Sequence, residues 1–100
     1  MFDNMALRVQ LTPPLNNTAG RNFLEIPLQG AENVDSLIIQ LIERFGRAFR
    51  QHLYDDRDVF IPSWAVFINK EPVQLNRPEA FTTPLKDGDE ISFLLALAGG

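Results

Sequence analysis

The chain has 100 residues, of which 45% are hydrophobic and 22% charged, and this is the size and composition of one globular domain. Its 13 acidic and 9 basic residues leave a formal net charge of −4, so a nucleic-acid backbone would find few cations to bind, and we expect no nucleic-acid partner. Cysteine is absent, which excludes disulfides, thiolate zinc sites and cysteine nucleophiles.

Residues 1–100 are predicted to form a single domain in which residues 1–4 are a disordered lead and residues 96–100 a flexible, functional C-terminal tail. The first residues lack the basic start and apolar run of a secretory signal. No stretch approaches the roughly 20 apolar residues of a membrane span. We therefore expect a cytoplasmic protein with no membrane partner.

Two strands are predicted in the first third of the chain. Residues 5–11 alternate apolar and polar side chains, the period of a half-buried strand, and the prolines at 13 and 14 end it. Residues 16–20 contain two asparagines and a glycine, which favour a turn or a flexible connection. Residues 23–28 alternate again, so the two strands are predicted to pair as an antiparallel hairpin.

The middle of the chain contains the clearest helix. Apolar residues recur at helical spacing from Val34 to Phe45 and again at Phe49, giving one broad apolar stripe. Asn33 or Asp35 is suited to cap its start. Gly46 is predicted to end or bend the helix, with a further helical turn within residues 47–53. Residues 54–63, which include four charged residues and a proline, are predicted to form an exposed loop.

The last third of the chain again favours strands. A strongly β-prone strand is expected over residues 64–69, a short edge strand over 73–75, an irregular segment around Pro78 and Pro84, and a final strand over 90–95. Gly88 provides the positive φ of a tight turn over residues 86–89. The economical way to bury both apolar stripes is an α+β roll, in which one main helix packs on one face of a mixed sheet of four to five strands.

The final strand runs into Gly99-Gly100, and more apolar side chains lie near it than one buried face requires. Leu94, Leu95 and Leu97 are the surplus. They suggest a groove for a partner, although a strand buried on both faces would have the same pattern. A frayed tail without function is the alternative explanation of the two glycines.

Three segments near the end resemble the closing signature of the ubiquitin-like, β-grasp sulfur carriers, a family that includes the small subunit of molybdopterin synthase and the thiamine sulfur carrier. They are residues 84–90 (Pro-Leu-Lys-Asp-Gly-Asp-Glu), residues 91–94 (Ile-Ser-Phe-Leu) and residues 98–100 (Ala-Gly-Gly). Residues 34–37 and 66–69 resemble the family's helix start and third strand more loosely. The resemblance implies the ubiquitin-like β-grasp fold for this chain.

The resemblance also implies a chemistry for the C-terminal glycines. The carboxylate of Gly100, which follows Gly99, would be converted into an acyl adenylate and then into a thiocarboxylate. The chain has no P-loop pattern, so ATP is expected to act in trans on a separate adenylating enzyme of the ubiquitin-activating type. We expect no bound cofactor, no metal and no complete enzyme in this chain alone, only the sulfur-donating subunit of a sulfurtransferase-type complex.

The partners implied are the adenylating enzyme and, most specifically, the large subunit of molybdopterin synthase, so that the chain would act in molybdenum cofactor biosynthesis. Apolar residues near Val73 and Leu94 on the outer sheet surface contact the partner enzyme in the resembling family, and Leu97 and Ala98 lie in the tail that would enter it. For Val73, simple pairing along an edge strand is the alternative.

Several departures from the family pattern leave the pathway open. The segment 12–17 stands where many molybdopterin-type members end in Arg-Glu, Asn69-Lys70-Glu71 replaces the common Asn-Gly-Glu turn, and Leu95-Ala96 replaces two prolines. A carrier for thiamine, cysteine, tRNA thiolation or a tungsten cofactor is therefore an alternative. A ubiquitin-like modifier joined through Gly100 to a lysine of its target, and a non-covalent binding module with an idle tail, are two others.

Overall fold

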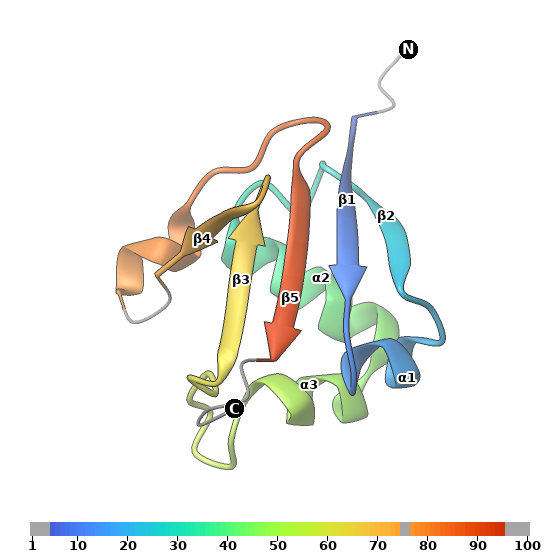
Figure 1. The fold of residues 1–100 in the computed structure, drawn as a ribbon, viewed down its shortest axis with the longest axis vertical. Helices are drawn as coiled ribbons and strands as arrows, with labels where there is room; N and C mark the ends of the chain where they lie inside the picture. The colour runs from blue at the N-terminus through green and yellow to red at the C-terminus, as the bar shows by residue number, and fades with distance from the viewer. Residues whose placement is uncertain (1–4, 75–76, 96–100) are drawn as a thin grey trace.

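The computed structural model of the protein describes residues 5–74 and 77–95, which form strands and helices of one α+β unit (Figure 1). In chain order the elements are β1 (Ala6–Leu11), α1 (Leu15–Ala19), β2 (Phe23–Pro27), α2 (Val34–Phe45), α3 (Arg47–Leu53), β3 (Trp64–Ile68), β4 (Glu71–Val73), the 3-10 helix η1 (Pro78–Thr82) and β5 (Glu90–Leu95).

The strands form one five-stranded mixed sheet in the order β2-β1-β5-β3-β4. The chain's first and last strands, β1 and β5, lie side by side in its middle and are the one parallel pair among the pairings described, with Val9 opposite Ile91. The hairpin of β1 and β2 is antiparallel, as predicted. Because β1 and β5 are parallel neighbours, their carboxyl ends lie close together at one end of the sheet (Figure 1).

Helix α2 lies across one face of the sheet, and the core fills the space between them (Figure 1). Alternate residues of the central strands point to this face, and the apolar stripe of α2 covers them. The fully buried members from these elements are Leu7, Val9, Val34, Leu37, Ile38, Leu41, Val66, Ile91 and Phe93. The predicted α+β roll with one main helix on one face of a mixed sheet is therefore confirmed.

Local chemistry explains the bounds of α2. The side-chain oxygen of Asn33 accepts a hydrogen bond from the backbone N–H of Ser36 at 2.8 Å, so Asn33, not Asp35, is the N-cap. The helix ends at Phe45 because Gly46 adopts φ 89°, a conformation that costs glycine little. The chain then turns into α3, whose Phe49 returns to the same core.

Two predictions about local structure are wrong in detail. The expected turn at residues 16–20 is the short helix α1, which buries Leu15 completely and ends at Gly20 with φ 77°. The edge strand expected at 73–75 is β4 at Glu71–Val73, because Asn69 and Lys70 both take positive φ and make a two-residue turn, so pairing resumes at Glu71. Leu75 lies outside the described residues.

The segment around Pro78 is also more regular than expected. It forms η1, with Pro78 in its first turn, where the missing N–H of a proline costs no helical hydrogen bond. Within residues 5–74 and 77–95, no helix combines the length and apolar character needed to cross a bilayer.

Candidate functional site: the last strand and its surroundings

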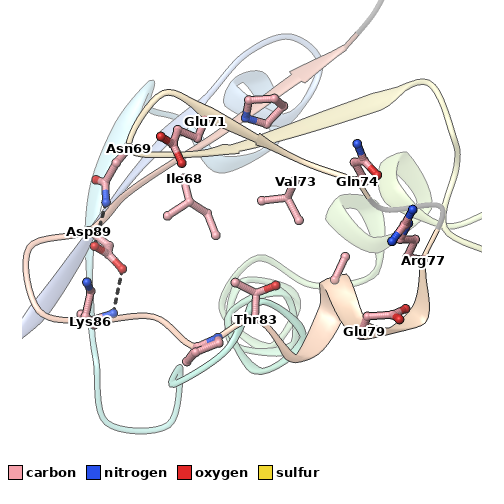
Figure 2. A pocket seen from close by; sticks show the side chains of 13 residues that line it. Ile68, Asn69, Glu71, Val73, Gln74, Arg77, Glu79, Thr83, Lys86 and Asp89 are labelled. Atoms are coloured by element: carbon pink, nitrogen blue, oxygen red, sulfur yellow. Dashed lines mark hydrogen bonds between the residues drawn. The ribbon is translucent and has the colours of Figure 1, made fainter.

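The loop that resembles the family signature holds the start of β5 in place. Asp89 is only 6% exposed, and its carboxylate accepts hydrogen bonds from the side-chain amide of Asn69 at 2.9 Å and from the backbone N–H of Lys86 at 2.8 Å (Figure 2). The Asn69 side-chain oxygen in turn accepts from the backbone N–H of Glu90 at 2.9 Å. Such bonds to an ionised group are stronger than neutral ones, so they anchor the turn between β3 and β4 to the start of β5.

The same loop also joins β5 to β1. The Asp87 side chain accepts from the backbone N–H of Ala6 at 2.9 Å, and the Gly88 N–H donates to the Ala6 carbonyl at 2.9 Å. Gly88 has φ 84°, as the predicted turn requires. The Asp-Gly-Asp part of the signature therefore has a structural role here, which is to place the last strand in the sheet.

The other end of β5 has a different surface. Ile91 and Phe93 are fully buried, but Leu94 and Leu95 are each 36% exposed. Leu94 is paired with Ala65 on the outer face of the sheet. Leu95 is paired with Trp64 at the last position of β5. Leu94 therefore lies on the outer sheet surface, as expected, and its partner-binding role stays a prediction.

Val73 does not share that face. The register pairs it with Val66, which is completely buried, and directly opposed residues of an antiparallel pair lie on the same side of the sheet. Val73 packs against the core, so the expectation that it lies on the outer surface is wrong. Its partner-binding role stays a prediction. Leu97, Ala98, Gly99 and Gly100 lie outside the described residues.

Beside Leu94 and Leu95 lies an apolar groove of about 550 Å³, which we call the tail-base groove. Its walls are Thr12, Pro13, Pro14, Leu94 and Leu95. The sequence prediction missed it, because residues 12–14 read only as the end of a strand. Two signals together could have revealed the groove. Two prolines follow β1, and surplus leucines end β5, the strand parallel to β1.

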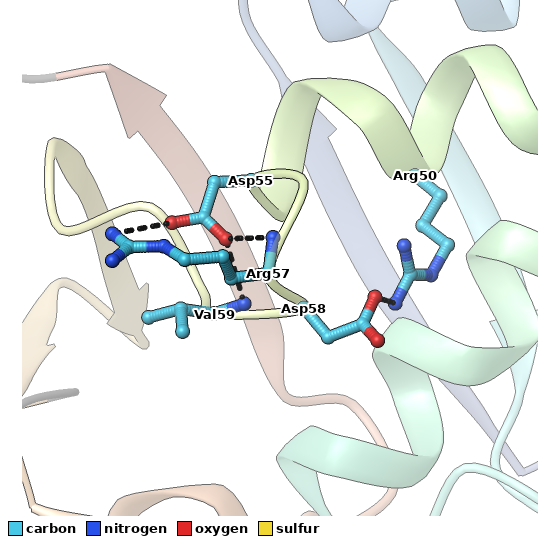
Figure 3. A network of polar contacts seen from close by, with 5 residues as sticks. All are labelled: Arg50, Asp55, Arg57, Asp58 and Val59. Atoms are coloured by element: carbon cyan, nitrogen blue, oxygen red, sulfur yellow. Dashed lines mark hydrogen bonds and ion pairs between the residues drawn. The ribbon is translucent and has the colours of Figure 1, made fainter.

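The loop predicted between α3 and β3 is present and largely exposed, and Asp55 orders it (Figure 3). Its side chain accepts from the backbone N–H groups of Arg57 at 2.8 Å and Val59 at 3.0 Å. The bonds from Val59 and then Arg57 lower the pKa of Asp55 below its ordinary value, because they stabilise the ionised form. Asp58 forms an ion pair with Arg50 at 2.7 Å, so these charges order the loop, and nothing in them suggests a cation site.

His52, the single histidine, has a structural position. Its ring Nε2 lies 3.0 Å from the Thr18 hydroxyl, and its carbonyl accepts from the indole N–H of Trp64 at 2.7 Å. These contacts join α1, α3 and β3. Among the described residues, no group of three or more histidines and acidic residues is placed to hold a metal ion.

A pocket of about 610 Å³ lies between the β3–β4 hairpin and η1, beside the anchored start of β5 (Figure 2). Ile68 and Val73 point into it, Lys86 and Asp89 stand at one end, and Arg77 stands at the other. Because charges of both signs line it and Asp89 is already hydrogen-bonded, the pocket does not select one class of ligand.

Comparison with known proteins agrees with the family signature. A sequence model of the ThiS family matches residues 9–100, a range that includes Gly99 and Gly100. No curated protein matches the chain significantly.

Several solved structures share the fold. Small archaeal modifier protein 1 from Methanosarcina acetivorans has a TM-score of 0.77 at 24% identity, over 96% of this chain and 97% of its own. A chain of the BexX/CysO complex from Amycolatopsis orientalis has a TM-score of 0.74 at 23% identity, over 95% and 100%. A Pyrococcus furiosus protein proposed as subunit 1 of molybdopterin converting factor has a TM-score of 0.68 at 20% identity, over 94% and 100%. The predicted ubiquitin-like β-grasp fold is thereby confirmed.

Proposed function

The chain belongs to the ThiS family of ubiquitin-like sulfur carriers, and from this premise we propose that it carries sulfur as a thiocarboxylate formed on Gly100. The observation that supports this most directly is the extent of the family match, which continues through the two glycines at 99 and 100. The exposed leucines at the end of β5 add to it, because they leave an apolar surface next to the residues that would enter an enzyme.

The proposed chemistry begins with an inert group. A terminal carboxylate has a pKa of about 3.3–3.7 and is ionised at neutral pH, so it resists nucleophiles. A carboxylate oxygen of Gly100 attacks the α-phosphorus of ATP in a separate adenylating enzyme, and pyrophosphate leaves. Sulfide then attacks the carbonyl carbon and expels AMP, which leaves a thiocarboxylate at Gly100. Where the sulfur donor is a persulfide instead, its attack expels AMP and forms an acyl disulfide; a thiol of the donor system then attacks the donor's sulfur, forms a disulfide with it and releases the thiocarboxylate. With no cysteine in the chain, no protein persulfide can form on it.

For the pathway, we propose that the chain is the small subunit of molybdopterin synthase. Its tail would enter the large subunit, which would supply the acid, base and substrate-binding groups. The likeness to the Pyrococcus furiosus protein supports this pathway at the level of the fold. The likeness to the BexX/CysO chain keeps sulfur transfer to other acceptors as the alternative.

Intact mass measurement tests the proposal. The purified chain is incubated with an adenylating enzyme, ATP and a sulfur donor, and we expect its mass to rise by the difference between one sulfur and one oxygen atom. A variant that lacks Gly99 and Gly100 is the control and should keep its mass. Adding the large subunit and its pterin precursor should then return the chain to its original mass. Absence of any adenylate with every cognate activating enzyme would refute the carrier function.

A second function, protein modification through Gly100, is supported by the likeness to small archaeal modifier protein 1. The same adenylate serves both fates, because a lysine amine can expel AMP as sulfide does. Conjugates of high molecular weight in cell extracts, lost when Gly99 and Gly100 are removed, would favour the modifier. Their absence, together with a thiocarboxylate on the chain, would favour the carrier.

A further inference from the structure

We propose that the free edge of β2 pairs with β2 of a second copy of this chain, so that two sheets join into one across a two-fold axis. The proposal goes beyond the proposed function and does not depend on it. β2 and β4 are the two edge strands of the sheet, and Figure 1 shows β2 as the outermost strand on one side. The unpaired N–H and C=O groups of an edge strand are able to bind another strand.

The register of the β1–β2 hairpin determines which backbone groups of β2 are free. The Asn22 carbonyl accepts from the N–H of Leu11 at 2.8 Å, and the N–H of Leu28 donates to the carbonyl of Met5 at 3.0 Å. Because bonded and non-bonded pairs alternate along an antiparallel ladder, even-numbered residues of β2 face β1 and odd-numbered residues face outward. The outward residues are Phe23, Glu25 and Pro27.

Two of these outward residues present both a donor and an acceptor. Phe23 and Glu25 each have a free N–H and a free carbonyl, whereas Pro27 has only a carbonyl because proline lacks the N–H. In the part of the chain that the structure describes, no other residue bonds to the outward groups of Phe23 and Glu25. A partner strand that satisfies β2 must therefore pair with these two residues.

The opposite edge of the sheet is closed to such pairing. The N–H of Asn69, directly after β3, donates to the carbonyl of Glu90 on β5 at 2.8 Å. By the same alternation, Ile68 and Glu71 bond to each other across the hairpin, which turns Pro72 outward. Within Glu71–Val73 the edge of β4 thus has no outward N–H, and proline at an edge is a known protection against pairing with other chains.

Antiparallel self-pairing of β2 has one register that satisfies all the free groups of Phe23 and Glu25. When Phe23 lies opposite Glu25 of the second copy, two-fold symmetry repeats the pair, and each pair exchanges both of its N–H···O bonds. Registers that place either residue opposite Pro27 lose a donor, and the register that opposes the two Glu25 side chains also opposes like charges. Pairing Phe23 with itself puts Glu25 opposite Arg21, whose N–H already donates to the Asn16 carbonyl at 3.1 Å.

The selected register also brings compatible side chains together on the outer face of the sheet. Phe23 is 62% exposed, more than any other large apolar side chain in the described ranges. It lies opposite Glu25 of the second copy and diagonal to Phe23 of that copy, at the about 7–8 Å that aromatic side chains span. Arg8 is the partner of Glu25 within one chain and lies on the same side of the sheet, so it offsets the charge of Glu25.

The dimer is expected to be weak and to leave the functional end of each chain free. β2 has five residues, so the interface falls below the about 1,200 Å² of stable complexes. We therefore expect a dissociation constant on the order of 0.1 mM. In each copy β1 separates β2 from β5, and the antiparallel arrangement directs the ends of the two β5 strands to opposite ends of the joined sheet.

Sedimentation velocity of the full chain, from about 0.01 to about 1 mM, tests the proposal. We expect the wild type to shift from monomer towards dimer over this range. Glu25→Pro removes an outward N–H that bonds to no residue of its own chain, and should raise the dissociation constant at least about tenfold. Glu25→Gln is the matched control, because it keeps the N–H, and its dissociation constant should stay within about threefold of the wild-type value.

Cysteine cross-linking tests the register without relying on the fold of the proline variant. The chain has no cysteine, so introduced cysteines report only their own contacts. Phe23→Cys mixed with Glu25→Cys should form a mixed disulfide under air, because the Cα atoms of such a pair lie about 5.5 Å apart, within the about 4.4–6.8 Å of a disulfide. Phe23→Cys mixed with Ile39→Cys is the control, since Ile39 is exposed on α2, and should cross-link at least about fivefold less.

Thermal melting shows whether each variant is folded. A wild type that stays monomeric at about 1 mM overturns the proposal. So does a folded Glu25→Pro that dimerises like the wild type, since another surface would then be responsible. A mixed disulfide no more abundant than the Ile39→Cys control would do the same. None of these outcomes bears on adenylation of Gly100, whose failure would instead refute the proposed function.

Discussion

The two ends of β5 are built from opposite kinds of interaction. At its start, Asp89 and Asn69 form a network of hydrogen bonds that joins the strand to its neighbours. At its end, Leu94 and Leu95 expose apolar surface that no described residue covers. Hydrogen bonds with defined geometry fix a position, whereas exposed apolar surface favours association. The strand thus has one end suited to holding the fold and one suited to meeting a partner.

The largest expected effect comes from Gly99→Val, at the end that meets the enzyme. A β-branched side chain there would widen the tail and restrict its backbone, so we expect adenylation to fall by about 100-fold or more. Pyrophosphate exchange measures the loss, and circular dichroism should show an unchanged fold. Wild-type adenylation of this variant would contradict the proposed role of the tail.

At the opposite end, Asp89→Ala should destabilise the fold rather than block partner binding. It removes a buried carboxylate and leaves the Asn69 amide and the Lys86 N–H without their acceptor, which should cost about 2–3 kcal/mol in urea unfolding. Asp87→Ala is the control, because its single bond to Ala6 is exposed and should cost about 0.5–1 kcal/mol. Equal losses for the two variants would remove the special role assigned to Asp89.

Leu94→Asp should show the reverse pattern. Because Leu94 is 36% exposed, we expect the free energy of unfolding to change by less than about 1 kcal/mol. The affinity for the enzyme that receives the tail should fall by about tenfold, since a carboxylate would be buried at an apolar contact. Titration calorimetry measures the affinity. A large loss of stability with unchanged binding would place Leu94 in the core instead.

The smallest effect is expected in the loop that precedes β3, where the ionised form of Asp55 is stabilised by the N–H groups of Val59 and Arg57. Since its pKa is lower in the folded chain than in the unfolded chain, ionised Asp55 stabilises the fold above the unfolded pKa. This contribution is lost as the pH falls through the folded pKa. Asp55→Ala should therefore lower the urea midpoint slightly at pH 7 and reduce its dependence on pH below about 4.

Comparing urea midpoints of the wild type and Asp55→Ala across that range measures the effect. Asp56→Ala provides the matched control, because Asp56 has none of the hydrogen bonds described for Asp55. A parallel decline of the two variants with falling pH would show that Asp55 does not contribute.

Features that depend on neighbours in sequence were predictable. The Asn33 cap, the break at Gly46 and the turn at Gly88 follow from side-chain and backbone preferences that act over a few residues. The helix α1 was not predictable in this way, because its asparagines favour turns and the burial of Leu15 against the core overrides that preference.

The candidate site likewise has features that the sequence predicted and features that it did not. The glycines at 99 and 100, the surplus leucines and the signature loop were visible in the amino-acid order alone, because each is a local pattern. The face on which Val73 lies, and the meeting of Pro13 and Pro14 with Leu94 and Leu95, depend on strand register and on the parallel pairing of β1 with β5. The pairing of β1 with β5 joins residues about 80 positions apart, and only the packing of the whole sheet selects it.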